Sequence, residues 1–220
     1  MFVRVKNSQA WKHRILRPLE RLGFLYTGQT PKALQRFIQR LHPENTNIPL
    51  IRMGRPGDGG YLVPDDLDGI AALFSPGVAQ SSAFEADALE RGMTVHLADA
   101  SVEGPASGIA DLPGVHFRKE FVGARGRSDR LSLQDWVKES SLDASSDLMA
   151  QIDIEGAEYE LLLDSAPELL QRFRVLVIEF HSVEWWASPG MFQVVEAAIG
   201  RLLETHRVVH AHPNNWLGTK

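Results

Sequence analysis

Five ionisable residues at the ends of two successive apolar runs have the types and spacing that proton transfer or metal binding needs. Asp153, Glu155 and Glu158 lie in the stretch QIDIEGAE, where an apolar run ends and a helical pattern begins. Glu179 and His181 end the next apolar run, RVLVIEFH. Carboxylates and imidazoles exchange protons near neutral pH, and both also ligate divalent cations. Either chemistry requires the two segments to lie side by side in the fold.

Structural explanations also exist for these residues. Acids in a first helical turn stabilise the positive end of the helix dipole, which explains Glu158 and partly Glu155. It does not explain Asp153, which precedes Glu155 by two residues and shares its face of an extended strand. A buried Glu179 would need a partner, and His181 can be that partner. In the alternative, Asp153, Glu179 and His181 hold a divalent cation, Mg²⁺ or Mn²⁺, through oxygen and imidazole ligands.

The segments around these residues alternate between strand and helix patterns. Apolar runs predict strands at 70–77, 94–99, 114–123, 147–153, 174–181 and 207–212, and amphipathic stretches predict helices at 82–92, 132–140, 157–173 and 190–206. Gly92 is expected to close a helix, Ser132 to cap one and Pro167 to break one. This alternation predicts an α/β fold, with helices on both faces of a parallel sheet.

The N-terminal segment differs from the rest of the chain in charge and pattern. Residues 1–50 are predicted to form a short basic helical segment, with helical patterns at 9–25 and 31–41, and residues 51–220 a separate α/β domain. Nine basic residues against one acid give the first forty residues a net charge of +8, which leaves −13 for the remainder. This asymmetry indicates peripheral contact with an anionic surface, or simply a solvated helix face.

Composition excludes several classes of function. The 220 residues include no cysteine, so disulfides, thiolate metal sites and cysteine nucleophiles are excluded. Lys and Arg interrupt every apolar run near the start, so we predict neither a signal peptide nor a membrane span, and a cytoplasmic location. The acidic main domain argues against nucleic-acid binding.

A glycine and an acid follow the first two predicted strands of the domain. Gly77 opens the turn SPGVAQSS, and Asp99 ends the second strand 22 residues later. In dinucleotide-binding folds the turn allows close approach of a ligand and the acid hydrogen-bonds ribose hydroxyls. A pyrophosphate-binding turn contains three glycines, and this turn has only one. An adenosyl ligand without pyrophosphate is therefore favoured, which indicates S-adenosylmethionine rather than NAD.

Five stretches of the chain follow one another in a characteristic order, and they are DGGYLVPDDL (58–67), SPGVAQSSAFEADALERG (75–92), QIDIEGAEYELL (151–162), VIEFH (177–181) and HAHPNN (210–215). Together they resemble the FkbM-type methyltransferases. The resemblance covers roughly residues 50–215. It implies a Rossmann-like, S-adenosylmethionine-dependent O-methyltransferase that acts on a hydroxyl of a sugar, glycan or small metabolite. Ala79 replaces the second glycine of the family's first turn, and the chain ends before the last antiparallel strand that such folds normally add.

Positions at the predicted strand ends, together with the resemblance, suggest roles for individual residues. The catalytic residues are expected to be Asp153, Glu155 and His181. The residues that bind the cofactor are expected to be Asp58, Gly77, Glu85, Asp99 and Asp153. Two other interpretations of the same residues stay open. One is a metal-dependent hydrolase that also uses Glu179 and His212, and the other is a degenerate adenosyl-binding module without catalytic activity.

Overall fold

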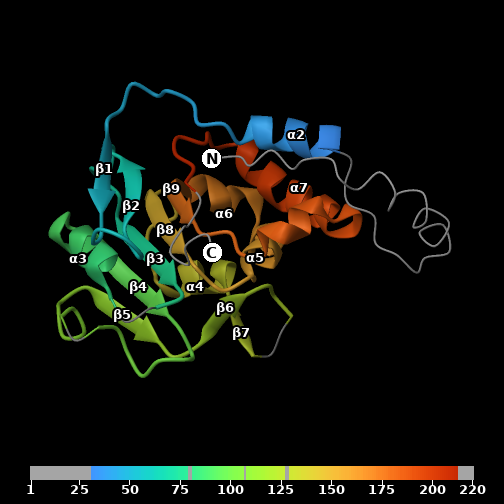
Figure 1. The fold of residues 1–220 in the computed structure, drawn as a ribbon. Coiled ribbons are helices and arrows are strands. Elements are labelled where there is room, and N and C mark those ends of the chain that lie inside the picture. The colour runs from blue at the N-terminus through green and yellow to red at the C-terminus, as the bar shows by residue number, and fades with distance from the viewer. Residues whose placement is uncertain (1–30, 79–80, 107, 127–128, 213–220) are drawn as a thin grey trace.

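The structure of the protein is a computed structural model that describes residues 31–78, 81–106, 108–126 and 129–212. Five strands form its main sheet, all parallel, in the order β5-β4-β3-β8-β9 (Figure 1). Their bounds are β3 Ala72–Pro76, β4 Thr94–Ala98, β5 Val115–Arg118, β8 Leu148–Ile152 and β9 Phe173–Ile178. The prediction of an α/β fold with a parallel sheet and helices is confirmed. The predicted helix at 9–25 lies outside the described residues.

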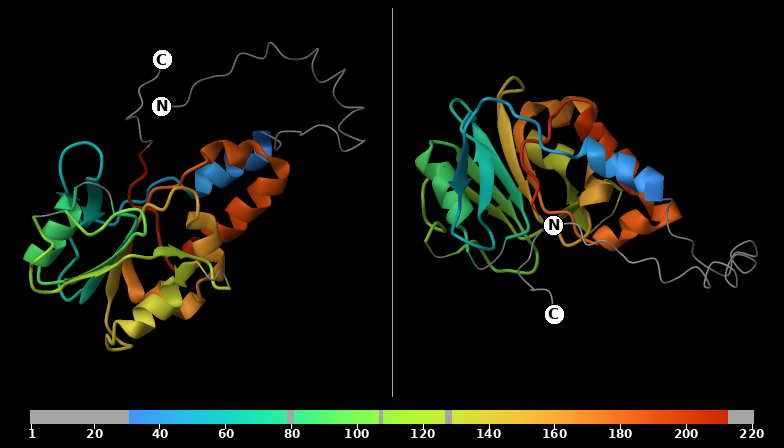
Figure 2. Two further views of the ribbon diagram at one scale, coloured as in Figure 1. Left: turned by 90° about the horizontal axis from the view of Figure 1, so that it is seen from below. Right: turned by 45° about the horizontal axis from the view of Figure 1, so that its top comes forward.

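Helices cover both faces of this sheet (Figures 1 and 2). One face packs against α3 (Ala83–Glu90) and against the antiparallel hairpin of β1 (Leu50–Met53) and β2 (Tyr61–Pro64). The other face packs against helices from the second half of the chain and from its start. These are α2 (Pro31–Arg40), α4 (Leu133–Glu139), α5 (Glu158–Asp164), α6 (Pro167–Arg172) and α7 (Pro189–Leu203). The two cores are separated by the sheet, because neighbouring residues of a strand point to opposite faces.

Strand order places a switch point at the centre of the sheet. The chain leaves β3 toward β4 and β5 on one side, and then returns to add β8 and β9 on the other side. Ligands of open α/β sheets bind at the carboxyl ends of the strands beside such a switch. The carboxyl ends of β3 and β8 lie at this position. Gly77 is the first residue after β3 and Asp153 the first after β8, so both lie beside the switch point.

Several local predictions are confirmed. Ser132 caps α4, because its hydroxyl accepts a hydrogen bond of 3.0 Å from the backbone N–H of Asp135. Gly92, at φ +84°, follows the end of α3, and its backbone N–H donates to the carbonyl of Leu89. Pro167 begins α6 after a break from α5.

Two strand predictions are wrong. Residues 114–123 do not form one strand, because the chain turns at 119–120 and the second half becomes β6 (Phe121–Gly123), which pairs with β7 (Arg130–Ser132). Residues 207–212 form no strand, so β9 is the last strand of the main sheet within the described residues. In that segment the carbonyl of Val208 instead accepts a hydrogen bond from the backbone N–H of Glu44.

Helix α2 packs into the core of the main sheet. Phe37 is 1% exposed and makes edge-to-face contacts with Trp186 and Phe192, at centroid distances of 5.4 Å each. Trp186 belongs to the short 3-10 helix η1 (Val183–Ala187), and Phe192 belongs to α7. Within the part of the chain that is described, no helix has the length and apolar character needed to cross a bilayer.

Candidate functional site

The turn after β8 brings three carboxylates to the end of the strand. Glu155 and Gly156 both have positive φ angles, +54° and +104°, and this pair redirects the chain from the strand into α5. The left-handed conformation is ordinary for glycine and uncommon for Glu155. Strained backbone of this kind is typical of ligand sites, where surrounding contacts hold it in place.

Glu158 organises this turn from inside the protein. Its side chain is 0% exposed, and its Oε1 atom accepts hydrogen bonds of 3.1 Å from the backbone N–H groups of Ile154 and Gly156. The same oxygen lies 3.0 Å from Nδ1 of His181, on the segment after β9. Sequence reasoning assigned Glu158 to the helix dipole alone. Its burial and its bond to a residue 23 positions away left no signal in the sequence.

The hydrogen bond to Glu158 fixes the orientation of His181. Because Nδ1 donates to the carboxylate, Nε2 faces the two other acids, 3.7 Å from Asp153 and 3.5 Å from Glu155. The backbone of His181 is held as well, because its carbonyl accepts a hydrogen bond of 2.9 Å from the Tyr159 hydroxyl. A ligating or catalytic histidine is commonly oriented by a carboxylate in this way.

Asp153, Glu155 and His181 form the only group of three or more possible metal-ligating side chains found among the described residues. One potential ligand atom from each lies within 4.8 Å of the other two. The three predicted catalytic residues are therefore together. The predicted metal set differs in one member, because Glu155 rather than Glu179 completes the group.

Electrostatics at this cluster favour proton exchange near neutral pH. Burial and then the charge of Glu179 raise the pKa of Asp153, which the charge of His181 lowers in part, and the result is a pKa of about 6. Burial alone would lower the pKa of His181, but the hydrogen bond and charge of Glu158, with Asp153 and Glu155, raise it overall. A carboxylate with a pKa near 6 is suited to act as a general base at neutral pH.

Glu179 belongs to a second polar network beside the cluster. The Tyr61 hydroxyl, from the start of β2, donates a hydrogen bond of 3.0 Å to Oε2 of Glu179. Burial and the charges of Glu179 and Asp153 raise the pKa of Tyr61, so the phenol stays protonated and remains a donor. Gln151 of β8 also hydrogen-bonds this phenol. The motif DGGY indicated a loop near the site, but nothing in the sequence indicated these partners.

Glu85, in the first turn of α3, joins this network through Ser75 of β3. Ser75, fully buried, makes hydrogen bonds of 2.6 Å with Glu85 and 2.9 Å with Oε1 of Gln151. Glu85 is 6% exposed, and its burial raises the pKa of its carboxyl group. The carboxylate of Glu85 is therefore hydrogen-bonded inside the protein. The expectation that Glu85 binds the cofactor stays a prediction.

Gly77 makes a close contact that the sequence did not predict, and its contact with a cofactor stays a prediction. At φ +87°, a Cβ atom there would lie 1.6 Å from the carbonyl oxygen of Asp153. The absent side chain therefore makes room for the end of β8. This close approach holds the first turn against Asp153, which also donates its backbone N–H to the carbonyl of Pro76.

Asp99 ends β4 as predicted, and it holds the first turn in place. Its Oδ2 atom accepts a hydrogen bond of 2.9 Å from the Val78 backbone N–H, and its Oδ1 atom accepts from the N–H and hydroxyl of Ser101. A carboxylate has about four acceptor positions, and hydrogen bonds from described residues use three of them on Asp99.

Neither Asp58 nor His212 belongs to the group of Asp153, Glu155 and His181. Asp58 is exposed in the β1–β2 connection, three residues before Tyr61, and its carbonyl accepts from Nε of Arg55. His212 is exposed and its ring stacks near that of His210, at 6.2 Å. Residues 213–215, which end the stretch HAHPNN, lie outside the described residues. Comparison of the chain with protein-family models, curated proteins and solved structures found no match.

Proposed function

We propose that this protein is an S-adenosylmethionine-dependent O-methyltransferase that acts on a hydroxyl of a sugar, glycan or small metabolite. The supporting observation is the array of Glu158, His181 and Asp153 at the carboxyl end of β8, where Asp153 has a pKa of about 6. This array adjoins the first turn at Gly77, which Asp99 anchors. The resemblance to FkbM-type methyltransferases points to the same activity.

The donor and acceptor groups around the first turn are compatible with an adenosyl ligand. Counting the described residues only, the bonds from Val78 and Ser101 leave Asp99 one acceptor position, which suits a single ribose hydroxyl rather than two. The Val78 N–H is already engaged and is therefore not a donor to the ligand. S-adenosylmethionine would supply an electrophilic methyl group when bound.

The protein's own residues would position the acceptor and remove its proton. Asp153 accepts the hydroxyl proton as the oxygen becomes nucleophilic, a role that contributes a factor of about 10² to 10⁴ in rate. His181 keeps Nε2 toward Asp153, because Glu158 holds the opposite nitrogen. Glu155, whose side chain is 87% exposed, faces the solvent from which the acceptor arrives.

A divalent cation is a further cofactor that these residues can hold. Two carboxylate oxygens from Asp153 and Glu155 with the imidazole of His181 form a mixed oxygen and nitrogen set. A cation there would acidify a bound hydroxyl. Calorimetric titration with Mg²⁺ or Mn²⁺ tests this, and we expect His181→Gln to weaken binding. Equal affinity of the variant and wild type would contradict the assignment.

Cofactor binding is tested with S-adenosylhomocysteine, the demethylated product. We expect one site per chain by isothermal titration calorimetry. Asp99→Asn should weaken binding, because the amide replaces an acceptor oxygen with a donor and disturbs the Val78 contact. Asp65→Asn is the matched control, since Asp65 is an exposed acid after β2. A folded wild-type protein that shows no binding would overturn the proposal.

Turnover is tested with labelled S-adenosylmethionine and a panel of hydroxylated sugars and metabolites. Asp153→Asn should reduce methyl transfer about 100-fold or more, while product binding is retained. Metal-dependent cleavage of phosphoesters by a protein that does not bind S-adenosylhomocysteine would favour the hydrolase interpretation. Binding of S-adenosylhomocysteine by the wild-type protein, without turnover on any acceptor, would favour a non-catalytic binding module.

A further inference from the structure

The short helix η1 exposes two large apolar side chains directly after His181. Trp185 is 36% exposed and Val183 is 57% exposed. The other large apolar side chains that are exposed within the described ranges lie elsewhere, and they are Ile48, Leu50, Leu112 and Phe121. Leaving a tryptophan exposed forgoes more apolar burial than exposing a smaller side chain. The place of Trp185 beside the candidate site therefore points to a contact with a ligand.

Contacts with the first turn of α5 hold Trp185 near the candidate site. Its ring centroid lies 6.3 Å from that of Tyr159, which is 1% exposed. The Tyr159 hydroxyl donates a hydrogen bond of 2.9 Å to the carbonyl of His181, and it accepts one of 2.8 Å from Nε1 of Trp186. One buried side chain therefore connects the exposed ring of Trp185 with the residue whose imidazole faces Asp153.

Strand order places Trp185 on the side of the site that is left for the acceptor. Asp153 follows β8, which lies between β3 and β9 in the sheet. Gly77 and Asp99, which are proposed to meet the adenosyl ligand, follow β3 and β4 on one side of β8, whereas η1 follows β9 on the other side. Methyl transfer needs the acceptor oxygen in line with the methyl group, opposite its donor. A donor over β3 and β4 therefore leaves the side of β9 to the acceptor.

The charge of the site selects against anionic acceptors. The side chains that interact with the charge of Asp153 are three other carboxylates, Glu155, Glu158 and Glu179, and one imidazole, that of His181. These groups repel phosphate and carboxylate groups, and one divalent cation would not cancel their charge. Carboxylate oxygens instead accept hydrogen bonds from hydroxyl groups. An aromatic ring beside them attracts the weakly positive C–H groups on the face of a sugar ring, because the face of its own π-system is negative.

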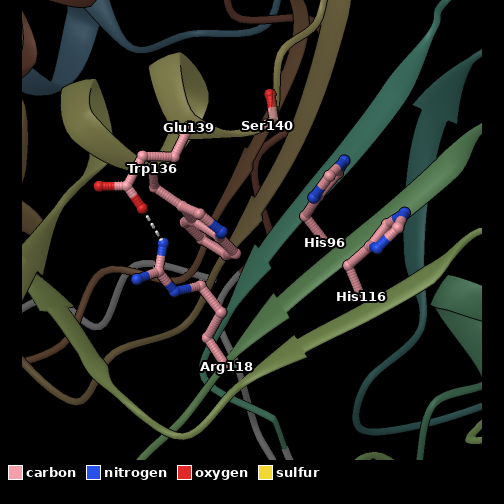
Figure 3. A pocket seen from close by; sticks show the side chains of 6 residues that line it. All are labelled: His96, His116, Arg118, Trp136, Glu139 and Ser140. Carbon is pink, nitrogen blue, oxygen red and sulfur yellow. Dashed lines mark hydrogen bonds and ion pairs between the residues drawn. The ribbon is translucent and has the colours of Figure 1, made fainter.

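A cavity in another part of the sheet offers no competing acceptor site. It measures about 380 Å³, and its lining residues are His96, His116, Arg118, Trp136, Glu139 and Ser140 (Figure 3). The charged groups of its wall, Arg118 and Glu139, are paired with each other. None of the lining residues belongs to the group of Asp153, Glu155 and His181, so a hydroxyl bound there would not meet the proposed base.

We propose that Trp185 binds the acceptor, and that this acceptor is a sugar without anionic groups whose apolar face stacks on the indole ring. The inference rests on the proposed methyl transfer and selects the sugar among its acceptor classes. In the reaction, a sugar oxygen forms a bond to the methyl carbon, and the carbon–sulfur bond of S-adenosylmethionine breaks with its electron pair on sulfur. The hydroxyl proton passes to Asp153. The products are a methyl ether of the sugar and S-adenosylhomocysteine.

The test measures acceptor kinetics of the full-length protein with labelled S-adenosylmethionine and uncharged glycosides, namely methyl glucoside, methyl galactoside and cellobiose. We expect Trp185→Ala to raise the KM for the glycoside about tenfold, because the stacking contact is lost. The kcat should change less than about twofold, since the contact is the same in the ground state and the transition state. Trp185→Phe keeps an aromatic face and should recover most of the affinity. Val183→Ala, in the same helix, is the matched control and should leave KM unchanged.

Two binding measurements separate this inference from the proposed function. Saturation-transfer NMR detects glycoside binding without turnover, and calorimetric titration with S-adenosylhomocysteine reports cofactor binding. Trp185→Ala should lose the saturation transfer to the glycoside and bind S-adenosylhomocysteine with wild-type affinity. Circular dichroism checks that the variant is folded, as the exposure of Trp185 leads us to expect.

Several results would overturn the role of Trp185 while the methyltransferase proposal stands. One is an equal KM in wild type and Trp185→Ala, or an equal rise of KM in Val183→Ala. Weaker binding of S-adenosylhomocysteine by Trp185→Ala would show that the ring contacts the cofactor instead. A wild-type protein that binds S-adenosylhomocysteine but no glycoside, or that prefers the phosphate ester of the glucoside, would overturn the sugar assignment. A folded wild-type protein that does not bind S-adenosylhomocysteine would overturn both proposals.

Discussion

At the scale of single residues, the candidate site depends on Glu158, a carboxylate that makes no contact with solvent. One of its oxygens accepts from two backbone N–H groups of the β8–α5 turn and from His181. Hydrogen bonds to a charged acceptor are stronger than neutral ones. Glu158 therefore fixes both the shape of the turn and the direction in which His181 presents its second nitrogen.

We expect Glu158→Gln to lower the free energy of unfolding by about 1–3 kcal/mol, because it weakens three hydrogen bonds at a buried position. It should also release His181 from a single tautomer. ¹⁵N imidazole shifts above pH 8 report the tautomer, and urea denaturation reports stability. Glu160→Gln, at an exposed position on the same helix, is the control. An unchanged His181 tautomer in Glu158→Gln would show that the carboxylate does not orient the ring.

Gly77 provides a second residue-scale prediction with a matched control in the same protein. Gly77→Ala places a methyl group 1.6 Å from the Asp153 carbonyl oxygen and also imposes a positive φ on alanine. Gly69 has a similar φ of +79° but open space around the added Cβ. Gly69→Ala should therefore cost only the conformational term, about 1–2 kcal/mol. Gly77→Ala should cost clearly more in urea denaturation, and equal losses would contradict the close packing described above.

At the scale of elements, the polar network across β3, β8 and β2 links the protonation of Glu85 to the direction of its hydrogen bonds. Ser75 has one hydroxyl proton, yet it bonds both Glu85 and the carbonyl oxygen of Gln151. The Ser75 hydroxyl can donate this proton to Glu85, or it can donate to Gln151 and accept from a protonated Glu85. Burial raises the pKa of Glu85 and favours the second arrangement, while the hydrogen bond from Ser75 lowers that pKa. The Gln151 amide can then donate to Tyr61, which donates to Glu179.

The second arrangement makes a prediction about pH. The folded protein retains a proton on Glu85 at pH values where the unfolded chain has lost it, so this residue's contribution to stability falls as pH rises above about 4.3. Glu85→Gln keeps the donor and removes the titration. We expect wild type and variant to be equally stable near pH 4, and the variant to be relatively more stable at pH 8. Urea denaturation at both values measures this, and a pH-independent difference would indicate an ionised Glu85.

The same scale shows what could be predicted from the sequence and what could not. Local apolar periodicity, with Ser132 and Gly92, predicts the strands β3, β4 and β8 and the helices α3 and α4. These signals could be found because each lies within about ten residues of the element that it specifies. Residues 207–212 have the same local pattern but find no strand partner. Asp153, Glu155 and His181 could be placed together, because each follows a predicted parallel strand and such strands end at the same edge of the sheet. The hydrogen bonds among Tyr61, Gln151 and Ser75 could not be predicted, because side-chain contacts between distant segments leave no periodic signal.

At the scale of the whole molecule, α2 and the parallel sheet share one core, although the sequence patterns divide near residue 50. Phe37 is almost fully buried between Trp186 and Phe192, and Arg40 lies 3.7 Å from Glu196 of α7. Trp186 also donates to the Tyr159 hydroxyl, which in turn holds the backbone of His181. A change at Phe37 therefore has a physical route to the candidate site through η1.

We expect Phe37→Ala to lower the free energy of unfolding by about 3–5 kcal/mol, because it leaves a cavity in a shared core. Since α2 packs into the same core as the sheet, the loss should appear in a single cooperative transition followed by both tryptophan fluorescence and circular dichroism. Phe121→Ala is the control, because that ring is 45% exposed and its removal should cost less than about 1 kcal/mol. A separate early transition in wild type, lost in Phe37→Ala, would instead show that α2 unfolds independently of the sheet.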